Sequence, residues 1–219
     1  MGKKAKQRTE PCPATEPSQD KATDAAGNSY LFFHMANAKH GEFCQWFPAI
    51  FVISKADISQ LVGRNIDESD PEGSILFNCA EQFMMFCKAA RFADTDRQIR
   101  VLATPSPKEQ KRLGRQTVGF THDEWDLVKS KVVEAGNIAK FTQNEHLGRK
   151  LLATGSRIIV EAASNDPVWG IGYSEKCAMD SQQHWGENRL GRALMVTREH
   201  LKREELQKKR GDWWIEQEE

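Results

Sequence analysis

The spacing of apolar residues predicts a mostly helical chain with a few short strands. Four consecutive apolar residues, Tyr30 to Phe33, fit a short buried strand. A second strand is expected over 49–54, after Pro48 interrupts the aromatic stretch EFCQWFPAIFVIS, and a third over 157–162. The segment 55–74 is polar and contains several Asp and Gly residues, which predicts a surface excursion.

Start and stop signals place helices between and after these strands. Three N-terminal cap motifs are found at 78–81, 106–109 and 121–124, and they predict helices over 79–93, 107–114 and 122–142. A shorter helix fits 144–153 and ends before Gly155, while a last helix begins near Leu190 and continues into the charged run LKREELQKKR. Helices dominate and the strands are scattered, so we expect an α+β protein, mostly helical, with one compact core.

The ends of the chain differ from its middle. Residues 1–28 are rich in Pro, Thr, Ser and charged residues, which predicts a disordered tail. We expect the folded domain to cover 29–205 and a charged helical tail to cover 206–219. The chain has 219 residues, which is enough to bury a sizeable core.

The amino-acid composition argues against several classes of function. The 31 basic and 31 acidic residues balance, which argues against coating nucleic acid by bulk charge but allows a local phosphate pocket. No segment approaches the roughly 18 apolar residues needed to cross a membrane. The five cysteines and six histidines show no zinc-ligand spacing, so no metal site is expected and a reducing, cytoplasmic setting is favoured. Basic residues at 3–8 leave a nuclear location open.

An acid and a lysine share one face of the helix predicted over 79–93. Glu81 and Lys88 are seven residues apart, and Met85 and Phe92 lie on the same face. Both charged groups can therefore point into one pocket. The alternative is structural, because Glu81 could complete a capping box while Lys88 reaches solvent along its stem.

Two further cations have spacing that allows a role in binding. Lys140 lies beside the Trp125 face of the helix predicted over 122–142, where it either reaches an anion, loses its charge by desolvation or extends to the surface. Arg115 follows a helix end, and its guanidinium suits bidentate phosphate contacts, although most surface arginines are merely solvated.

The loop SNDPVWGIG, 164–172, combines an acid, a large ring and two glycines. Pro167 keeps Asp166 out of helical geometry, and Gly170 permits close approach of another group. Trp169 is either a stacking platform or a core residue that closes the loop. The segment HWGENRLG, 184–191, likewise combines an aromatic ring with glycines, and its amide residue is Asn188. Two such loops favour a binding cleft.

Taken in order, these segments resemble the NADAR (YbiA-like) family of N-glycosidases. The matching stretches are EFCQWFP, AEQFMMFCKA, KEQKRLGRQ, WDLVKSKV, AKFTQNEHLGRKLLATGSRIIVEA, SNDPVWGIG and GENRLGRALM. The resemblance implies a compact, mostly helical α+β fold and a pocket for ribose phosphate or ADP-ribose. It matches the family's functional positions to Glu81, Lys88, Arg115, Trp125, Lys140, Glu161, Asp166, Trp169 and Asn188.

The resemblance also implies a reaction, the cleavage of an N-glycosidic bond to an exocyclic amine. Family members act either on phosphorylated riboflavin-pathway intermediates or on ADP-ribosylated guanine in nucleic acid. Gln82, Phe83 and the entry loop over 43–47 depart from the small bacterial members and look more like the eukaryotic branch. The expected substrate is therefore an ADP-ribosylated guanine nucleotide or nucleic acid, with ADP-ribose as product and no membrane partner.

A lysine Schiff base gives the working mechanism. Lys88 would form the imine with ribose C1, with Lys140 as its rival, and Glu81 would be the acid and base. Asp166 would orient the sugar hydroxyls or serve as a second carboxylate, and no cofactor is required. The expected substrate-binding residues are Trp46, Arg115, Trp125, Lys140, Trp169, Gly170 and Asn188. Four alternatives stay open: a two-carboxylate mechanism through Glu81 and Asp166, a hydrolase of phosphorylated ribosylaminopyrimidines, a binding module without turnover, and an inactive scaffold whose charged C-terminal helix binds a partner.

Overall fold

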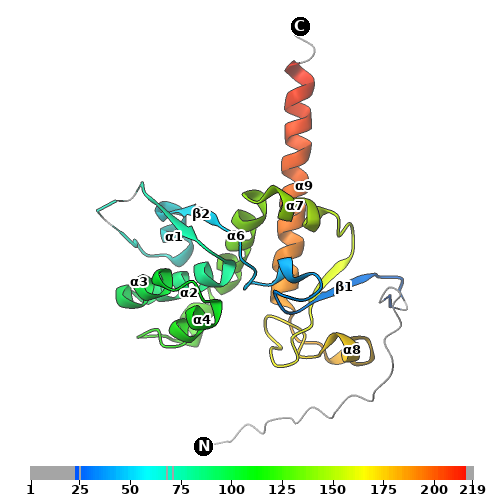
Figure 1. Ribbon diagram of the computed structural model, residues 1–219, viewed down its shortest axis with the longest axis horizontal. Coiled ribbons are helices and arrows are strands. Elements are labelled where there is room, and N and C mark those ends of the chain that lie inside the picture. The colour runs from blue at the N-terminus through cyan, green and yellow to red at the C-terminus, as the bar shows by residue number, and fades with distance from the viewer. Residues whose placement is uncertain (1–22, 25, 68, 71, 216–219) are drawn as a thin grey trace, which may run out of the picture.

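The computed structural model describes residues 23, 24, 26–67, 69, 70 and 72–215 of the chain (Figure 1). Most of the tail expected over 1–28, including the basic residues at 3–8, therefore lies outside the described residues, as does the end of the C-terminal tail. The boundary expected at 205 falls inside the last helix, α9 (Arg189–Ile215), which continues through it without a break.

The strands form two separate pairs. Strand β1 (Tyr30–Phe33) pairs in parallel with β4 (Ile158–Glu161), in a register that sets Phe33 beside Glu161. Strand β2 (Phe51–Ser54) pairs antiparallel with β3 (Ser74–Phe77). The expected strands at 30–33, 49–54 and 157–162 are thus confirmed with slightly different ends, whereas β3, which begins at the end of the segment 55–74, was not predicted.

Helices make up most of the described chain. They are α1 (Lys55–Val62), α2 (Ala80–Arg91), α3 (Thr95–Ala103), α4 (Pro107–Gly114), α5 (His122–Asp126), α6 (Lys129–Thr142), α7 (Glu145–Leu152), α8 (Glu175–Ala178) and α9, with short 3-10 turns at Gly41–Phe43 and Met179–His184. The mostly helical α+β class is confirmed. None of the helices in the described part of the chain is long and apolar enough to cross a membrane.

One helix was not predicted and another was predicted too long. The segment expected as a surface excursion begins with α1, which is capped by Ser54 and buries Ile58 and Val62. These residues lie four positions apart on one helical face, a signal obscured by the polar residues around them. The helix predicted over 122–142 is interrupted where Val128 leaves helical geometry, so that α5 and α6 are separate.

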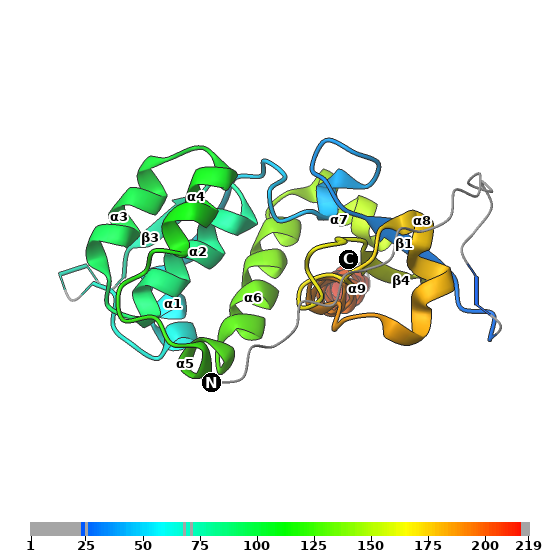
Figure 2. The same cartoon turned by 90° about the horizontal axis from the view of Figure 1, so that it is seen from below.

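The long helix α6 separates two groups of elements. In Figure 2, α1 to α5 lie on one side of α6, and β1, β4, α7, α8 and α9 lie on the other. Gly136 allows α2 to pack closely on α6, because a Cβ at this position would lie 2.6 Å from the Phe83 ring. The two groups therefore meet along α6.

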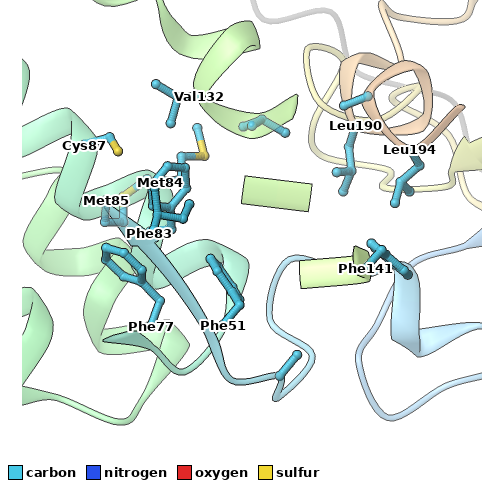
Figure 3. Close-up of a cluster of buried hydrophobic side chains, with 14 of the residues drawn as sticks. Phe51, Phe77, Phe83, Met84, Met85, Cys87, Val132, Phe141, Leu190 and Leu194 are labelled. Carbon is cyan, nitrogen blue, oxygen red and sulfur yellow. The ribbon is translucent and has the colours of Figure 1, made fainter. Parts of the chain in front are cut away.

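One large hydrophobic core connects both groups. On one side, Phe83 packs edge-on against Phe77 with ring centroids 5.1 Å apart, and Phe51 lies next to both. Phe141 belongs to the same core, together with Leu190 and Leu194 of α9 (Figure 3). A smaller cluster lies around the β1–β4 pair and contains Tyr30, Phe32, Val160, Ala162, Ile171 and Ala178. Because the main core contains residues from both sides of α6, it fixes the positions of the two groups of elements relative to each other.

Candidate active site

Glu81 lies in the first turn of α2 and is 5% exposed. The predicted capping box does not form, because Gln82 rather than Glu81 accepts the hydrogen bond from the Asn78 N–H, at 2.8 Å. The Glu81 carboxyl is thus not used as a cap, and its Oε1 is buried without a hydrogen-bond partner among the described residues. A buried acid that serves no capping role is a candidate for chemistry.

Burial raises the pKa of Glu81 to about 7. Lys111 opposes this rise, as do a hydrogen bond from the Trp46 side chain and the charge of Arg115, while Asp166 adds to it. The carboxyl is therefore poised to exchange a proton near neutral pH, as a general acid or base requires.

Lys88 follows two turns later on the same helix and is 9% exposed. Its Nζ lies 3.8 Å from the centroid of the Phe120 ring, and the ion pairs found among the described residues do not include it. Burial lowers the pKa of Lys88, the Arg115 charge lowers it further, and Glu81 opposes the change. Lys88, Arg115 and Glu81 thus act on one another electrostatically.

Lys140 is fully buried, but its ammonium is already engaged. Its Nζ donates hydrogen bonds to the Glu42 carbonyl at 2.8 Å and the Cys44 carbonyl at 3.0 Å. Burial lowers the pKa of Lys140 to about 8. These carbonyls belong to the loop that continues into Gln45 and Trp46, so Lys140 holds this loop in place. The loop contacts Glu81 directly, because the Gln45 carbonyl accepts the Glu81 N–H.

A second acid enters the site from the other side of α6. Glu161 is the last residue of β4, and its Oε2 is buried without a hydrogen-bond partner in the described part of the chain. Burial raises the pKa of Glu161 to about 8, with further contributions from Asp166 and Glu81 against the opposing charge of Lys111. The resemblance matched Glu161 to a family position, but the sequence assigned it no role. The sequence feature that could have indicated a functional role for Glu161 is its position as a lone acid at the end of an apolar strand.

Asp166 closes the turn that follows β4. Its Oδ1 accepts hydrogen bonds from the Val168 N–H at 3.1 Å and the Trp169 N–H at 2.9 Å. Trp169 is half-buried and packs against the main core, so its ring also has a structural role. Since Asp166 acts electrostatically on both Glu81 and Glu161, three carboxyls meet in this region.

Gly170 and Asn188 hold the end of β4. A Cβ at Gly170 would lie 2.7 Å from the Glu161 carbonyl oxygen, so this position has room only for glycine. Asn188 has a positive φ of 49° and bridges two strand residues, since its Oδ1 accepts the Glu161 N–H at 3.0 Å and its Nδ2 donates to the Ile159 carbonyl at 2.9 Å. The close approach expected at Gly170 is therefore made by the protein's own backbone.

The remaining predicted binding residues fall into two environments. Trp125 is 6% exposed and packs in the main core. Arg115 is exposed just after α4, and Lys111 lies one turn before it, so their i, i+4 spacing directs two cations towards the Glu81 region. Sequence reasoning gave Lys111 no role, although this spacing was visible.

Trp46 connects Glu81 to a surface groove. Besides its hydrogen bond to Glu81, its ring lies 5.9 Å from the Lys111 Nζ. The groove has a volume of about 660 Å³ and is lined by Trp46, Pro48, Ala49, Ile50, Asn78, Cys79, Pro105, Pro107 and Asn144. Within the described ranges, no group of three or more His, Cys, Asp or Glu residues is arranged to hold a metal ion.

The fold and this arrangement of acids and cations can be compared with known proteins. The NADAR domain model matches residues 31–202. N-glycosidase R617 of Acanthamoeba polyphaga mimivirus is 36% identical over 177 residues, which cover 78% of this chain and 96% of that protein. N-glycosidase YbiA of Escherichia coli is 34% identical over 116 residues, covering 53% of this chain and 67% of YbiA.

A solved structure supports the same relationship. The NMR structure of E. coli YbiA aligns with a TM-score of 0.59 and 25% identity, covering 81% of this chain and 87% of YbiA. The architecture is thus that of the YbiA fold. The chain belongs to the NADAR domain family, and the family resemblance stated from its motifs is confirmed.

Proposed function

We propose that the protein is an N-glycosidase that hydrolyses the bond between ribose C1 and an exocyclic amine, and that it removes ADP-ribose from guanine in nucleotides or nucleic acid. Glycosidase chemistry is supported by the relatives that carry the name N-glycosidase. The observation that carries the proposal is Glu81, a buried carboxyl with one oxygen that has no hydrogen-bond partner among the described residues, on the same helix face as the buried Lys88.

Lys88 is the group we propose to form the covalent intermediate. A ribose linked to an exocyclic amine opens to an imine at C1, which a neutral lysine can attack before the amine departs. Burial beside Arg115 lowers the pKa of Lys88 and so increases its neutral fraction. Lys140 suits this role less well, since two backbone carbonyls already accept its N–H groups.

Glu81 is proposed to carry protons during these steps. A carboxyl with a pKa of about 7 exists in both protonation states near neutral pH, so it can take the proton released as Lys88 adds to C1 and later return it. Asp166 is proposed to orient sugar hydroxyls, because its Oδ1 is held by two backbone N–H groups and the turn fixes its position.

The surroundings of Glu81 favour a substrate larger than a ribose phosphate. Arg115 and Lys111 place two positive charges near the acid, which suits the two phosphates of ADP-ribose. Trp46 and three prolines line the adjoining groove, and flat apolar walls of this kind suit a planar base. A nucleic-acid substrate would place the activity in the cytoplasm or nucleus.

An oligonucleotide with one ADP-ribosylated guanine tests the proposal. Wild-type protein is expected to release ADP-ribose and restore the unmodified oligonucleotide, whereas Glu81→Gln is not. Glu205→Gln, at an exposed position of α9, is the matched control and should act like wild type. Cleavage of a phosphorylated ribosylaminopyrimidine alone would indicate the alternative hydrolase. Tight binding of ADP-ribose without release would indicate a binding module, and either result would overturn the proposal.

A further inference from the structure

Glu161 is the acid that the roles above leave unused. It belongs to β4, which lies on the other side of α6 from α2, the helix that carries Glu81 (Figure 2). Its Oε2 is buried and has no hydrogen-bond partner among the described residues. Its backbone is fixed at both ends, because its N–H donates to Asn188 and its carbonyl accepts from Ile171 at 3.0 Å. A rigid backbone with an unpartnered buried carboxyl oxygen is a preorganised arrangement for contacting a ligand.

We propose that Glu161 is the acid that protonates the departing amine, so that the site uses a pair of carboxyls, Glu81 and Glu161, contributed from the two sides of α6. This proposal rests on the glycosidase function proposed above. It assigns the two acids different tasks: Glu81 serves the attacking lysine, and Glu161 serves the leaving group.

The environment of Glu161 suits the role of a proton donor. Its Oε2 receives no hydrogen bond from the described chain, whereas Asp166 Oδ1 accepts two backbone N–H bonds. Burial together with the charges of Asp166 and Glu81 raises the pKa of Glu161 to about 8, against the opposing charge of Lys111. Burial also raises the pKa of the Cys44 thiol, and the charge of Glu161 in turn helps to raise it. Glu161 is therefore mostly protonated at neutral pH, as a proton donor must be.

The proton and electron count of the step is balanced. After Lys88 has added to C1, the carbon carries both the lysine nitrogen and the exocyclic nitrogen. The bond from C1 to the exocyclic nitrogen breaks, its electron pair stays on that nitrogen, and the Glu161 proton moves there to give a neutral amine. C1 and Lys88 are left as a protonated imine and Glu161 as a carboxylate. Water then adds to C1 and gives a proton to Glu161, which restores the acid and leaves a carbinolamine. Glu81 relays the hydroxyl proton of the carbinolamine to the Lys88 nitrogen, the bond from C1 to that nitrogen breaks, and the ribose leaves as its C1 aldehyde with Lys88 restored.

Substrates with different leaving amines test this role directly. An amine of low basicity departs without needing a proton, so loss of the acid matters less for it. The probes are ADP-ribosylated guanine oligonucleotide, N-(5-phosphoribosyl)aniline and N-(5-phosphoribosyl)-4-nitroaniline. Glu161→Gln is expected to lose about 10²–10⁴-fold in kcat/KM with the aniline probe and less than about 10-fold with the 4-nitroaniline probe, while the guanine oligonucleotide establishes turnover by wild type. Glu81→Gln should be impaired with all three.

Two further variants separate chemistry from folding. Glu161→Asp keeps a carboxyl and is expected to retain more activity with the aniline probe than Glu161→Gln. Glu187→Gln changes an exposed acid near Asn188 that pairs with Arg189, and it should match wild type. Equal losses by Glu161→Gln with both aniline probes would overturn the proposed role of Glu161 alone. Absence of turnover by wild type with every probe would overturn the glycosidase function, and the role of Glu161 with it.

Discussion

Glu81 in α2 and Glu161 in β4 come from opposite sides of α6, and the charge of Glu81 contributes to the raised pKa of Glu161. The two residues are far apart in the sequence and come from different groups of elements. Their proximity is a product of the core that joins these groups along α6. A pair of carboxyls with pKa values near 7 and 8 can hold one proton and lack another near neutral pH, which is what a reaction with two proton transfers requires.

The first prediction concerns the alkaline side of the pH profile. Glu161 must be protonated to donate, and its pKa is raised to about 8 by burial and by Asp166 and Glu81. Wild-type kcat/KM is therefore expected to fall as the pH rises above about 8. Glu161→Gln should lack this fall, because the amide does not ionise. An unchanged alkaline limb in Glu161→Gln, measured from pH 6 to 10 with the aniline probe, would contradict the assignment.

Stability should respond to pH through the same carboxyl. The pKa of Glu161 is raised from 4.5 to about 8 on folding, so the folded protein holds this proton more tightly than the unfolded chain. That contribution is complete below about pH 4.5 and is lost as the pH rises through 8. Glu161→Gln avoids the loss, and we expect it to be more stable than wild type by up to about 5 kcal/mol, or roughly 10–20 °C in Tm, at pH 8.5. The two proteins should differ little at pH 5 in thermal melts, and a constant difference across pH would rule this explanation out.

The two buried lysines should respond differently to removal of the ammonium. Lys140→Met leaves the Glu42 and Cys44 carbonyls without their donor, which is expected to cost about 2 kcal/mol of stability. Lys88→Met removes an ammonium that lies over Phe120, and its stability should change by less than about 1 kcal/mol. In activity the order reverses: Lys88→Met should be inactive, while folded Lys140→Met keeps turnover within about 10-fold of wild type. Denaturant titration combined with the oligonucleotide assay checks both halves.

Asn188 provides a test of how β4 is held. Asn188→Ala leaves the Glu161 N–H and the Ile159 carbonyl unpaired and keeps a side chain at a φ of 49°. The expected loss is about 3 kcal/mol, with roughly 1 kcal/mol of it from the backbone conformation. Asn188→Gly is the matched control, since it relieves the backbone strain but not the lost hydrogen bonds. Gly should therefore be the milder change, and equal stability of Asn188→Gly and wild type in urea titrations would show that the bridge is unimportant.

Local patterns in the sequence predicted much of the fold. The cap at Ser106 and the Pro107 that follows it define the start of α4 unambiguously, and the structure confirms the Ser106 hydrogen bond to the Glu109 N–H. The motif at 78–81 did not form a capping box, because Gln82 can also reach the Asn78 N–H and does so. The local pattern alone does not distinguish these outcomes. Which side chain accepts the Asn78 N–H depends on how Glu81 and Gln82 pack in the folded protein.

The site was predictable only in part, for a related physical reason. Helix periodicity placed Glu81 and Lys88 on one face, and the structure shows both in the same electrostatic environment. The periodicity of α6 could not show that Lys140 would bond to carbonyls of a loop far away in the sequence. The importance of Glu161 likewise depends on tertiary packing, since its neighbours Glu81 and Lys111 come from other elements.

Borohydride trapping followed by peptide mass spectrometry tests the proposed covalent chemistry most directly. Wild-type protein is incubated with the ADP-ribosylated oligonucleotide and reduced during turnover. We predict an ADP-ribose-derived mass increase on the peptide that contains Lys88, retained in Lys140→Met and absent in Lys88→Met. Turnover by wild type without any trapped adduct, or an adduct on Lys140 in place of Lys88, would contradict the proposed roles of the two lysines.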